Sequence, residues 1–411
     1  MEIKTDVVIV GTGVAGLYGA LNLPKDKKIL MITKSDLESS DSFLAQGGIC
    51  VQHDDNDYDS FFEDTMKAGH YENRKESVDI MIRNSRDVIN DLLEYGVDFE
   101  RDENGELAYT KEGAHARPRI LYHEDITGKE ITSTLLKRVK ERENITLKEY
   151  VTMTDLIVEN NKCKGIIAVE NDKDEEMKIF ADFTLLATGG IGGTYKNSTN
   201  FPHLTGDSIT IGKKYGIKMQ DLDYVQIHPT TLFSKKKGRR FLISESVRGE
   251  GALLYNKNHE RFVDELLPRD VVVGAIHKEM EKDGTEHVWL SMENIPTEDI
   301  LKHFPNIYKR CLEEGYDCTK EFIQVVPAQH YFMGGVWVDK DSKTSMDNLF
   351  AAGETSCNGV HGRNRLASNS LLESLVFAKR AAKKMIELYE DKWLWMILQW
   401  NYRLIILFLK P

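Results

Sequence analysis

Three glycines near the N-terminus have the spacing of a nucleotide-phosphate site. The apolar residues 7–10 lead directly into Gly11, Gly13 and Gly16 in a GxGxxG pattern. In this pattern the first glycine makes a tight turn, the second lets the backbone approach a pyrophosphate, and the third allows close packing of a helix on a strand. The amide groups at the start of the helix face the phosphate charge. We expect a dinucleotide site here, with a plain structural turn as the alternative.

The acidic residue that usually binds the ribose of NAD is missing. The pattern places an Asp or Glu about 20 residues further on, but residues 29–32 run into Thr33, Lys34 and Ser35. This argues against an ordinary NAD site. Lys34 either approaches the phosphates of the cofactor or is simply solvated.

A second group of polar and charged residues lies near the other end of the chain, in residues 348–354 and 362–371. The first segment, NLFAAGE, ends at Glu354, and the second, GRNRLASNSL, contains Arg363, Arg365 and Ser370. We interpret the two ends of the polypeptide as two halves of one cofactor site.

Length and composition set the class of protein. A chain of 411 residues can form two or three domains, and its charged fraction of 29% is that of a globular protein. The formal net charge of −12 argues against binding to nucleic acid or to an anionic membrane surface.

The cysteines indicate a reducing compartment. Their number is odd, and no CxxC spacing occurs, so neither a disulfide framework nor a zinc site is indicated and we expect no metal. No secretory signal precedes the first predicted strand. We therefore expect a cytoplasmic protein.

Strand-like and helical stretches alternate along the chain. Residues 60–68 and 77–95 are predicted helices, the second ending at Gly96, a usual C-terminal stop. Residues 151–158, 165–169 and 177–180 are predicted to form a small meander. The apolar run 183–186, which leads to Gly189 and Gly190, is predicted as a separate strand that returns the chain to the central sheet beside the cofactor.

Eight ordered motifs together resemble one flavoprotein family, that of succinate dehydrogenase, fumarate reductase and L-aspartate oxidase. The motifs are GTGVAG (11–16), SFLAQGGI (42–49), LLATGG (185–190), TGD (205–207), QIHPTT (226–231), SESVRGEGA (244–252), PRDVV (268–272) and AAGE (351–354). The resemblance extends from the N-terminus to about residue 390. It implies an FAD cofactor.

Two positions favour one branch of this family. Asp41 occupies the position at which the respiratory members carry the histidine linked covalently to FAD, so the resemblance implies non-covalent FAD here. Residues 111–128 look like the corresponding loop of the L-aspartate oxidases, where a glutamate that matches Glu112 faces the substrate amino group.

The resemblance also implies the substrate site. Arginine matches a carboxylate bidentately, which suits a small dicarboxylate, and Arg365 corresponds to such a ligand. His228 and His330 match substrate-binding histidines, and Ser244 a nearby polar contact. Glu245 matches a proton-relay carboxylate, and Arg248 and Arg269 the arginine pair that moves protons in fumarate reduction. His115, His123 and Arg363 have no assigned role.

The FAD contacts carry over motif by motif. Those expected are Gly11, Gly13, Val14, Ala15, Gly16, Lys34, Ser42, Ala45, Gln46, Gly47, Gly48, Asp207, Glu354, Ser370 and Leu371. For Glu354 the alternative is a carboxylate at the start of a helix, stabilised by the helix dipole.

The implied reaction is hydride transfer from the substrate Cα to the N5 atom of FAD, which converts L-aspartate to iminoaspartate, with fumarate or oxygen as the final oxidant. The amine must be neutral first, so Glu112 or solvent is the expected proton acceptor, and Arg269 a weaker one. In the family this is the first step of NAD biosynthesis through quinolinate, which makes quinolinate synthase a pathway neighbour. The alternatives are a soluble fumarate reductase or succinate-oxidising enzyme, and an inactive flavin-binding protein.

The implied architecture is α/β, a two-segment Rossmann-like FAD-binding domain (1–221 and 332–391) with an inserted α+β capping domain (222–331). The family usually continues into a C-terminal helical bundle, whereas residues 392–411 are a hydrophobic stretch interrupted by Gln399, Asn401 and Arg403. That stretch is too short and polar for a stable membrane span. It is a buried helix, an interfacial segment or, as we hypothesise, an out-of-frame end that replaces the bundle.

Overall fold

The computed structural model describes residues 1–408 except 174 and 237, and the side chains of the same residues up to 391. The fold is mixed α/β. Its strands are β1 (Glu2–Val10), β2 (Ile29–Ile32), β3 (Ile49–Cys50), β4 (Ile120–Leu121), β5 (Ile145–Lys148), β6 (Val151–Glu159), β7 (Lys162–Glu170), β8 (Glu175–Leu186), β9 (Met219–Gln220), β10 (Val225–Leu232), β11 (Leu253–Tyr255), β12 (Val288–Ser291), β13 (Ile323–Phe332), β14 (Gly335–Trp337), β15 (Leu349–Ala351) and β16 (Ser356–Cys357).

Helices cover these sheets and connect them. They are α1 (Val14–Leu21), α2 (Tyr58–Ala68), α3 (Lys75–Arg83), α4 (Ser85–Tyr95), α5 (Thr127–Lys140), α6 (Asp207–Lys214), α7 (Glu245–Gly249), α8 (Arg269–Asp283), α9 (Thr297–His303), α10 (Pro305–Glu313) and α11 (Asn369–Phe408). Short 3-10 turns span Asp41–Leu44 and Gly192–Thr194.

The largest sheet has the order β5-β2-β1-β8-β7-β6, and β15 also pairs with β8. The strands β5, β2, β1, β8 and β15 run parallel, as expected for an α/β nucleotide-binding sheet. Val7 and Ile9 of β1 are fully buried in one apolar cluster with residues of α1 and of the first part of α11, whereas Val8 and Val10 belong to a second cluster. This sheet therefore holds the GxGxxG turn at the carboxyl end of β1.

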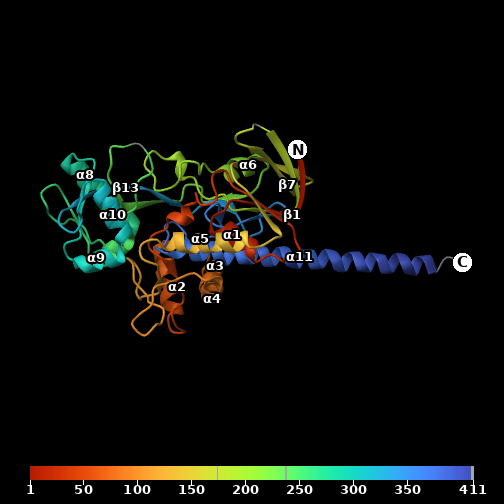
Figure 1. Ribbon diagram of the computed structural model, residues 1–411, viewed down its shortest axis with the longest axis horizontal. Helices are drawn as coiled ribbons and strands as arrows, with labels where there is room; N and C mark the ends of the chain where they lie inside the picture. Colours follow the sequence, from red (N-terminus) through yellow and green to blue (C-terminus); the bar gives the residue numbers. More distant parts are fainter. Residues whose placement is uncertain (174, 237, 409–411) are drawn as a thin grey trace.

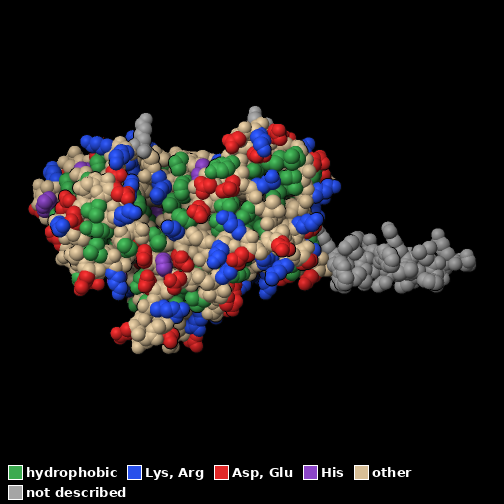
Figure 2. Space-filling model, in the orientation of Figure 1, with side chains coloured by type: hydrophobic (Ala, Val, Ile, Leu, Met, Phe, Trp, Pro, Cys, Tyr) green, Lys and Arg blue, Asp and Glu red, His purple; other side chains and the backbone are tan. Residues whose placement is uncertain are grey.

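A second sheet, β10-β13-β12-β11, is antiparallel and lies in the other half of the molecule. It packs with α7 to α10 around its own apolar core, which includes Ile243, Leu290 and Val325. In Figure 1, α8, α9, α10 and β13 gather at one end, while β1 and β7 lie toward the other. Side chains of both charge signs are interspersed on the face seen in Figure 2.

Two element predictions need correction. The helix expected over 77–95 is two helices, α3 and α4, separated at Asn84. Ser85 Oγ donates to Ile82 O at 2.7 Å, so a side chain takes the carbonyl that a continuous helix would use. Asn84 Nδ2 also donates to Ile80 O at 2.7 Å, beside the backbone bond from Asn84 N. The expected stop is confirmed, because Gly96 is left-handed with φ 94°.

The two strands expected at 177–180 and 183–186 are one strand, β8. Its residues from Lys178 to Leu186 pair with β1. This pairing keeps the backbone extended at the point where the neighbouring strand on the other side changes from β7 to β15. The first half pairs antiparallel with β7 and the second half parallel with β15. The helix predicted at 60–68 and the strands predicted at 151–158 and 165–169 are confirmed as α2, β6 and β7.

The side chains of residues 392–411 lie outside the described residues, so the interpretations of that hydrophobic stretch and of the missing bundle stay predictions. Within the residues that the structure describes, no helix is both long and apolar enough to cross a bilayer.

Candidate active site

The glycine motif forms a turn that brings the N-terminus of α1 close to the sheet. Gly11 has φ +116°, and a Cβ at this position would lie 2.0 Å from the carbonyl oxygen of Ala187. A Cβ at Gly16 would lie 2.1 Å from Gly11 O, so only glycine allows the helix to pack this closely on the turn. The N-terminus of α1 therefore lies at the adjacent cavity, which Gly13 and Ala15 line, and there the helix dipole favours an anion.

That cavity extends from the glycine turn to the antiparallel sheet. The empty space inside it, with its open mouth included, is about 1560 Å³. Predicted site residues that line it are Gly11, Gly13, Ala15, Lys34, Ser42, Ala45, Gln46, Gly47, Gly48, Glu112, Asp207, His228, Ser244, Glu245, Arg269, His330, Glu354, Arg365, Ser370 and Leu371. Val14, Gly16 and Arg248 are not among the residues that line it.

Lys34 and Asp207, two predicted cofactor residues, contact each other. Lys34 Nζ lies 2.8 Å from Asp207 Oδ2 and donates to Thr205 Oγ1 at 2.9 Å. Lys34 therefore does not stand free in solvent, which was one of its two interpretations. The pair holds the turn after β2 against the start of α6 at the rim of the cavity.

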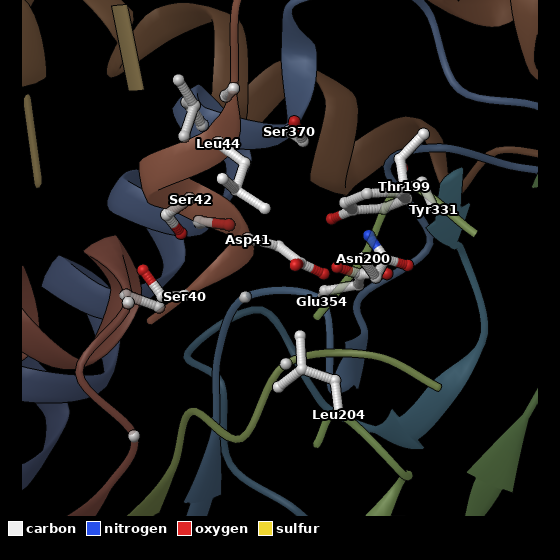
Figure 3. A pocket seen from close by; sticks show the side chains of 18 of the residues that line it. Ser40, Asp41, Ser42, Leu44, Thr199, Asn200, Leu204, Tyr331, Glu354 and Ser370 are labelled. Carbon is white, nitrogen blue, oxygen red and sulfur yellow. The ribbon is translucent and has the colours of Figure 1, made fainter. Parts of the chain in front are cut away.

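Two buried carboxyl groups, those of Asp41 and Glu354, point toward one another across the cavity (Figure 3). Asp41 Oδ1 accepts from Phe201 N and Glu354 Oε1 from Phe332 N, both at 2.9 Å. Burial raises the pKa of Asp41 to about 7, and burial together with the nearby Asp41 raises the pKa of Glu354 to about 8. Glu354 lies in the turn after β15, so its interpretation as a helix-start carboxylate is wrong.

Several buried polar atoms of the cavity wall lack a hydrogen-bond partner among the described residues. Three of them, Ser40 Oγ, Asp41 Oδ2 and Gln46 Oε1, lie on the segment that follows β2. Such atoms in native proteins usually contact a ligand or water. Together with the glycine turn, they fit a cofactor that has phosphates at one end and hydrogen-bonding ring edges further along.

Glu245 lies between two arginines at the far end of the cavity. Arg269 Nε donates to Glu245 Oε2 at 2.8 Å, and Arg248 Nη2 lies 2.6 Å from Glu245 Oε1. Burial opposes ionisation of Glu245, but the two guanidinium groups lower its pKa below the ordinary range. Arg269 reaches the cavity and Arg248 stands behind Glu245, so the three form a charged chain that leads away from the cavity.

The two predicted histidines lie side by side with ring centroids 5.1 Å apart. Both line the cavity, His228 is fully buried, and His330 Nδ1 lies 2.8 Å from Thr199 Oγ1. Burial, followed by the charge of Arg269, holds the pKa of each well below its ordinary value, so both rings are neutral. His228 Nε2 has no hydrogen-bond partner among the described residues and is free to bind a ligand.

Glu112 enters the same end of the cavity from the loop before β4. Its Oε1 accepts from Ser246 Oγ at 2.9 Å and its Oε2 from Ser368 Oγ at 2.6 Å. Burial raises its pKa, and the neighbouring Glu245 adds to that effect. A Cβ at Gly47 would lie 2.2 Å from Glu112 Oε1, so this glycine leaves room for the carboxylate.

Arg365 completes the wall opposite the histidines. Its Nη1 donates to Ser370 Oγ at 3.1 Å, and its guanidinium carbon lies 4.5 Å from the centroid of the Tyr331 ring. Its Nε has no partner among the described residues. Burial and the charge of Arg269 lower the pKa of Arg365 to about 10, so the group stays cationic at neutral pH.

Ser244 Oγ accepts from Ser246 N at 3.2 Å and so caps α7. Its hydroxyl therefore stabilises the start of the helix that carries Glu245 and Arg248. Sequence reasoning missed Gln226, which accepts from Arg269 Nη1 at 2.9 Å, and the two serines that bind Glu112. Each lies within a quoted motif, but spacing alone gave no reason to single it out.

Similarity to known proteins agrees with this geometry. The FAD binding domain family matches residues 6–371. L-Aspartate oxidases of Clostridium perfringens and Clostridium acetobutylicum are 54% and 51% identical to the chain, over 93% and 94% of it and 87% and 88% of their own lengths. A mutant of the E. coli quinol fumarate reductase, 29% identical, superposes with a TM-score of 0.89 over 94% of this chain and 70% of that one. The chain belongs to the L-aspartate oxidase family of FAD-binding flavoproteins.

Proposed function

We propose that the protein oxidises L-aspartate to iminoaspartate with FAD as the hydride acceptor, and that oxygen or fumarate then reoxidises the cofactor. The observation that carries this proposal is the set of groups at one end of the cavity. Two cationic arginines and two neutral histidines share it with a carboxylate, Glu112. Cations suit the two carboxylates of the substrate and Glu112 suits its amino group.

The FAD would lie between the glycine turn and this end of the cavity. The residues proposed to hold it are the glycines at the N-terminus of α1, the segment from Ser42 to Gly48, Asp207, Glu354 and Ser370 with Leu371. Bound FAD supplies the hydride acceptor. Non-covalent binding is supported by Asp41, which has no nucleophilic nitrogen to form the link.

We assign orientation of the substrate to Arg365, Arg269, His228 and His330. Guanidinium groups bind carboxylates bidentately, and the unpartnered Nε of Arg365 and Nε2 of His228 are available for that purpose. Fixing both carboxylates sets the position of Cα, and such positioning alone lowers a barrier considerably.

Glu112 is the proposed acceptor of the ammonium proton. Its pKa is raised by burial, which brings it nearer to neutral pH than an exposed glutamate. Arg269 is a poor base because a guanidinium does not deprotonate readily. When fumarate reoxidises the cofactor it needs a proton as well as the hydride, and Arg269 would donate that proton, with Glu245 and Arg248 behind it as the relay.

The decisive experiment mixes the purified yellow protein anaerobically with L-aspartate and follows the flavin absorbance, with succinate in parallel. Bleaching by L-aspartate alone is the expected result. Bleaching by succinate alone would assign the protein to the second candidate, a soluble fumarate reductase or succinate-oxidising enzyme, which the similarity to a fumarate reductase favours. Bound FAD that no dicarboxylate bleaches would identify an inactive flavin-binding protein.

Residues 222–331 are proposed to act as a cap whose closure excludes water from the site. A role in the first step of NAD biosynthesis, with quinolinate synthase as the enzyme that consumes the product, follows from the proposed reaction. Physical contact with that enzyme and a cytoplasmic location stay predictions.

A further inference from the structure

The loop that carries Glu112 is closed at its base and folded into the protein. Thr110 N donates to Ile120 O at 2.9 Å and Ile120 N to Thr110 O at 3.2 Å, so residues 111–119 form a separate nine-residue excursion. Within it Ala114 has φ +65°, a conformation that costs an alanine free energy and persists only where the surroundings impose it. Further contacts tie the other end of the loop to the protein.

Arg119 is completely buried and makes the strongest of those contacts. Its Nε and Nη2 donate to Asp57 at 3.1 and 2.9 Å, Nη2 also to Ser60 Oγ at 2.9 Å, and Nη1 to Asp64 Oδ2 at 2.6 Å. The remaining Nη1 proton goes to His115 Nδ1 at 3.0 Å. All five N–H groups of the guanidinium therefore have acceptors, which lysine could not reproduce.

This arrangement fixes the tautomer of His115. Since Nδ1 accepts from Arg119, the ring proton is on Nε2, which donates to Ala367 O at 3.1 Å. Burial and the charge of Arg119 lower the pKa of His115 to about 3, so the ring stays neutral and keeps both roles.

His115 thus joins the Glu112 loop to the chain segment that binds the Glu112 carboxylate. The residue after Ala367 is Ser368, which donates to Glu112 Oε2 and has φ +60°, another position that its surroundings must hold. Ser368 O accepts from Cys50 N at 3.0 Å, and Arg365 lies three residues before Ser368. The His115 ring therefore connects the loop that carries Glu112, the proposed amine contact, with the segment that carries Arg365, a proposed carboxylate ligand.

We propose that His115 and Arg119 are positioning residues that hold Glu112 against Ser368 and so determine selectivity for the amino group of the substrate. Neither residue is assigned a contact with substrate or cofactor. The proposal rests on the proposed function, in which Glu112 meets the substrate amine. It separates two properties of the site, because three of the proposed carboxylate ligands, His228, His330 and Arg269, come from other elements. Only the fourth, Arg365, lies on the segment that His115 contacts.

The test compares two reactions of the same FAD-loaded protein. L-Aspartate oxidation uses the amine contact, whereas fumarate reduction with a reduced viologen uses the carboxylate contacts alone. The variants are His115→Ala, which removes both hydrogen bonds, His115→Gln, which retains a donor and an acceptor, and Arg119→Lys. Glu112→Gln is the reference, and the double variant of Glu112→Gln with His115→Ala tests whether the two act together.

We expect His115→Ala and Arg119→Lys to lower kcat/KM for L-aspartate about 10- to 100-fold, the loss that a displacement approaching 1 Å produces, while fumarate reduction changes by less than about threefold. His115→Gln should restore part of the loss. The double variant should be no worse than Glu112→Gln alone, because residues that act as a unit are not additive.

An equal fall in both reactions would overturn the proposal and reduce the network to a structural support. Full additivity in the double variant would overturn it as well. If His115→Ala does not fold with FAD bound, His115→Gln and Arg119→Lys decide the question by the same ratio. Wild-type protein that fails to oxidise L-aspartate, or Glu112→Gln that oxidises it normally, would instead contradict the proposed function.

Discussion

Gly47→Ala tests the placement of Glu112 with the smallest possible change. The new Cβ would lie 2.2 Å from Glu112 Oε1 and 3.3 Å from Ser368 Oγ. Real Cβ atoms do not approach closer than about 3.0 Å, so the carboxylate would have to retreat by 3.0 − 2.2, about 0.8 Å. Gly47 does not have a left-handed φ, so alanine fits the backbone and the effect acts through the carboxylate.

A shift of this size costs about 10- to 100-fold in a reaction that depends on the displaced group. We therefore expect kcat/KM for L-aspartate to fall by that factor, measured by stopped-flow reduction of the flavin and expressed per bound FAD because Gly47 lines the cofactor cavity. The matched control is Gly274→Ala in the exposed part of α8, where a Cβ meets nothing within 4 Å. That control should keep full activity and gain up to about 1 kcal/mol of helix stability.

A Gly47→Ala variant that retains FAD and oxidises L-aspartate as fast as the wild type would contradict this expectation. Such a result would mean that the Glu112 carboxylate does not have to lie where Ser246 and Ser368 hold it. Loss of FAD in this variant alone would show instead that Gly47 serves the cofactor.

Three further perturbations probe the rest of the site. Gly11→Ala should abolish FAD retention on gel filtration, because its Cβ meets a backbone carbonyl at 2.0 Å in a left-handed conformation; retained flavin would contradict the assigned phosphate turn. Glu245→Gln should destabilise the protein by about 3 kcal/mol, the lower end for breaking a buried ion pair, since it leaves two buried guanidinium groups without a counter-charge; urea unfolding checks this, and an unchanged midpoint would count against it. Asp41 has its pKa raised to about 7, so its contribution to stability is fully present below its unfolded pKa near 4 and is lost as the pH rises through 7. Asp41→Asn should therefore stabilise the FAD-free protein by about 2 kcal/mol at pH 8 and by much less at pH 5, and an equal change at both pH values would refute this.

The sequence alone predicts the parts of this fold that depend on local patterns. The GxGxxG turn follows a buried strand, as its residue types require, and Gly96 ends its helix in the left-handed conformation. The meander of β6 and β7 follows from alternating apolar residues. Residues between 11 and 371 line one cavity. The family resemblance predicts that they come together, whereas the periodicity of apolar residues carries no such information.

The errors arise where long-range contacts override local signals. The apolar periodicity across 77–95 does not show that the Asn84 and Ser85 side chains take backbone carbonyls. Ala181 and Asp182, which interrupt the apolar run, do not show that pairing with β1 keeps β8 extended through them. Likewise, His115 cannot be distinguished from a surface histidine until the contacts of Arg119 with Asp57, Asp64 and His115 are known.

The closed base of the loop at Thr110 and Ile120 has an evolutionary consequence. The groups proposed to bind carboxylates come from β10, β13, α8 and the segment before α11, whereas the amine contact comes from this single excursion of nine residues. An ancestral enzyme could therefore exchange the excursion and acquire or lose the ability to use an amino acid without rebuilding its carboxylate site. Related enzymes for amino acids and for simple dicarboxylic acids can then diverge through one short insertion point, while the rest of the fold stays under the same selection.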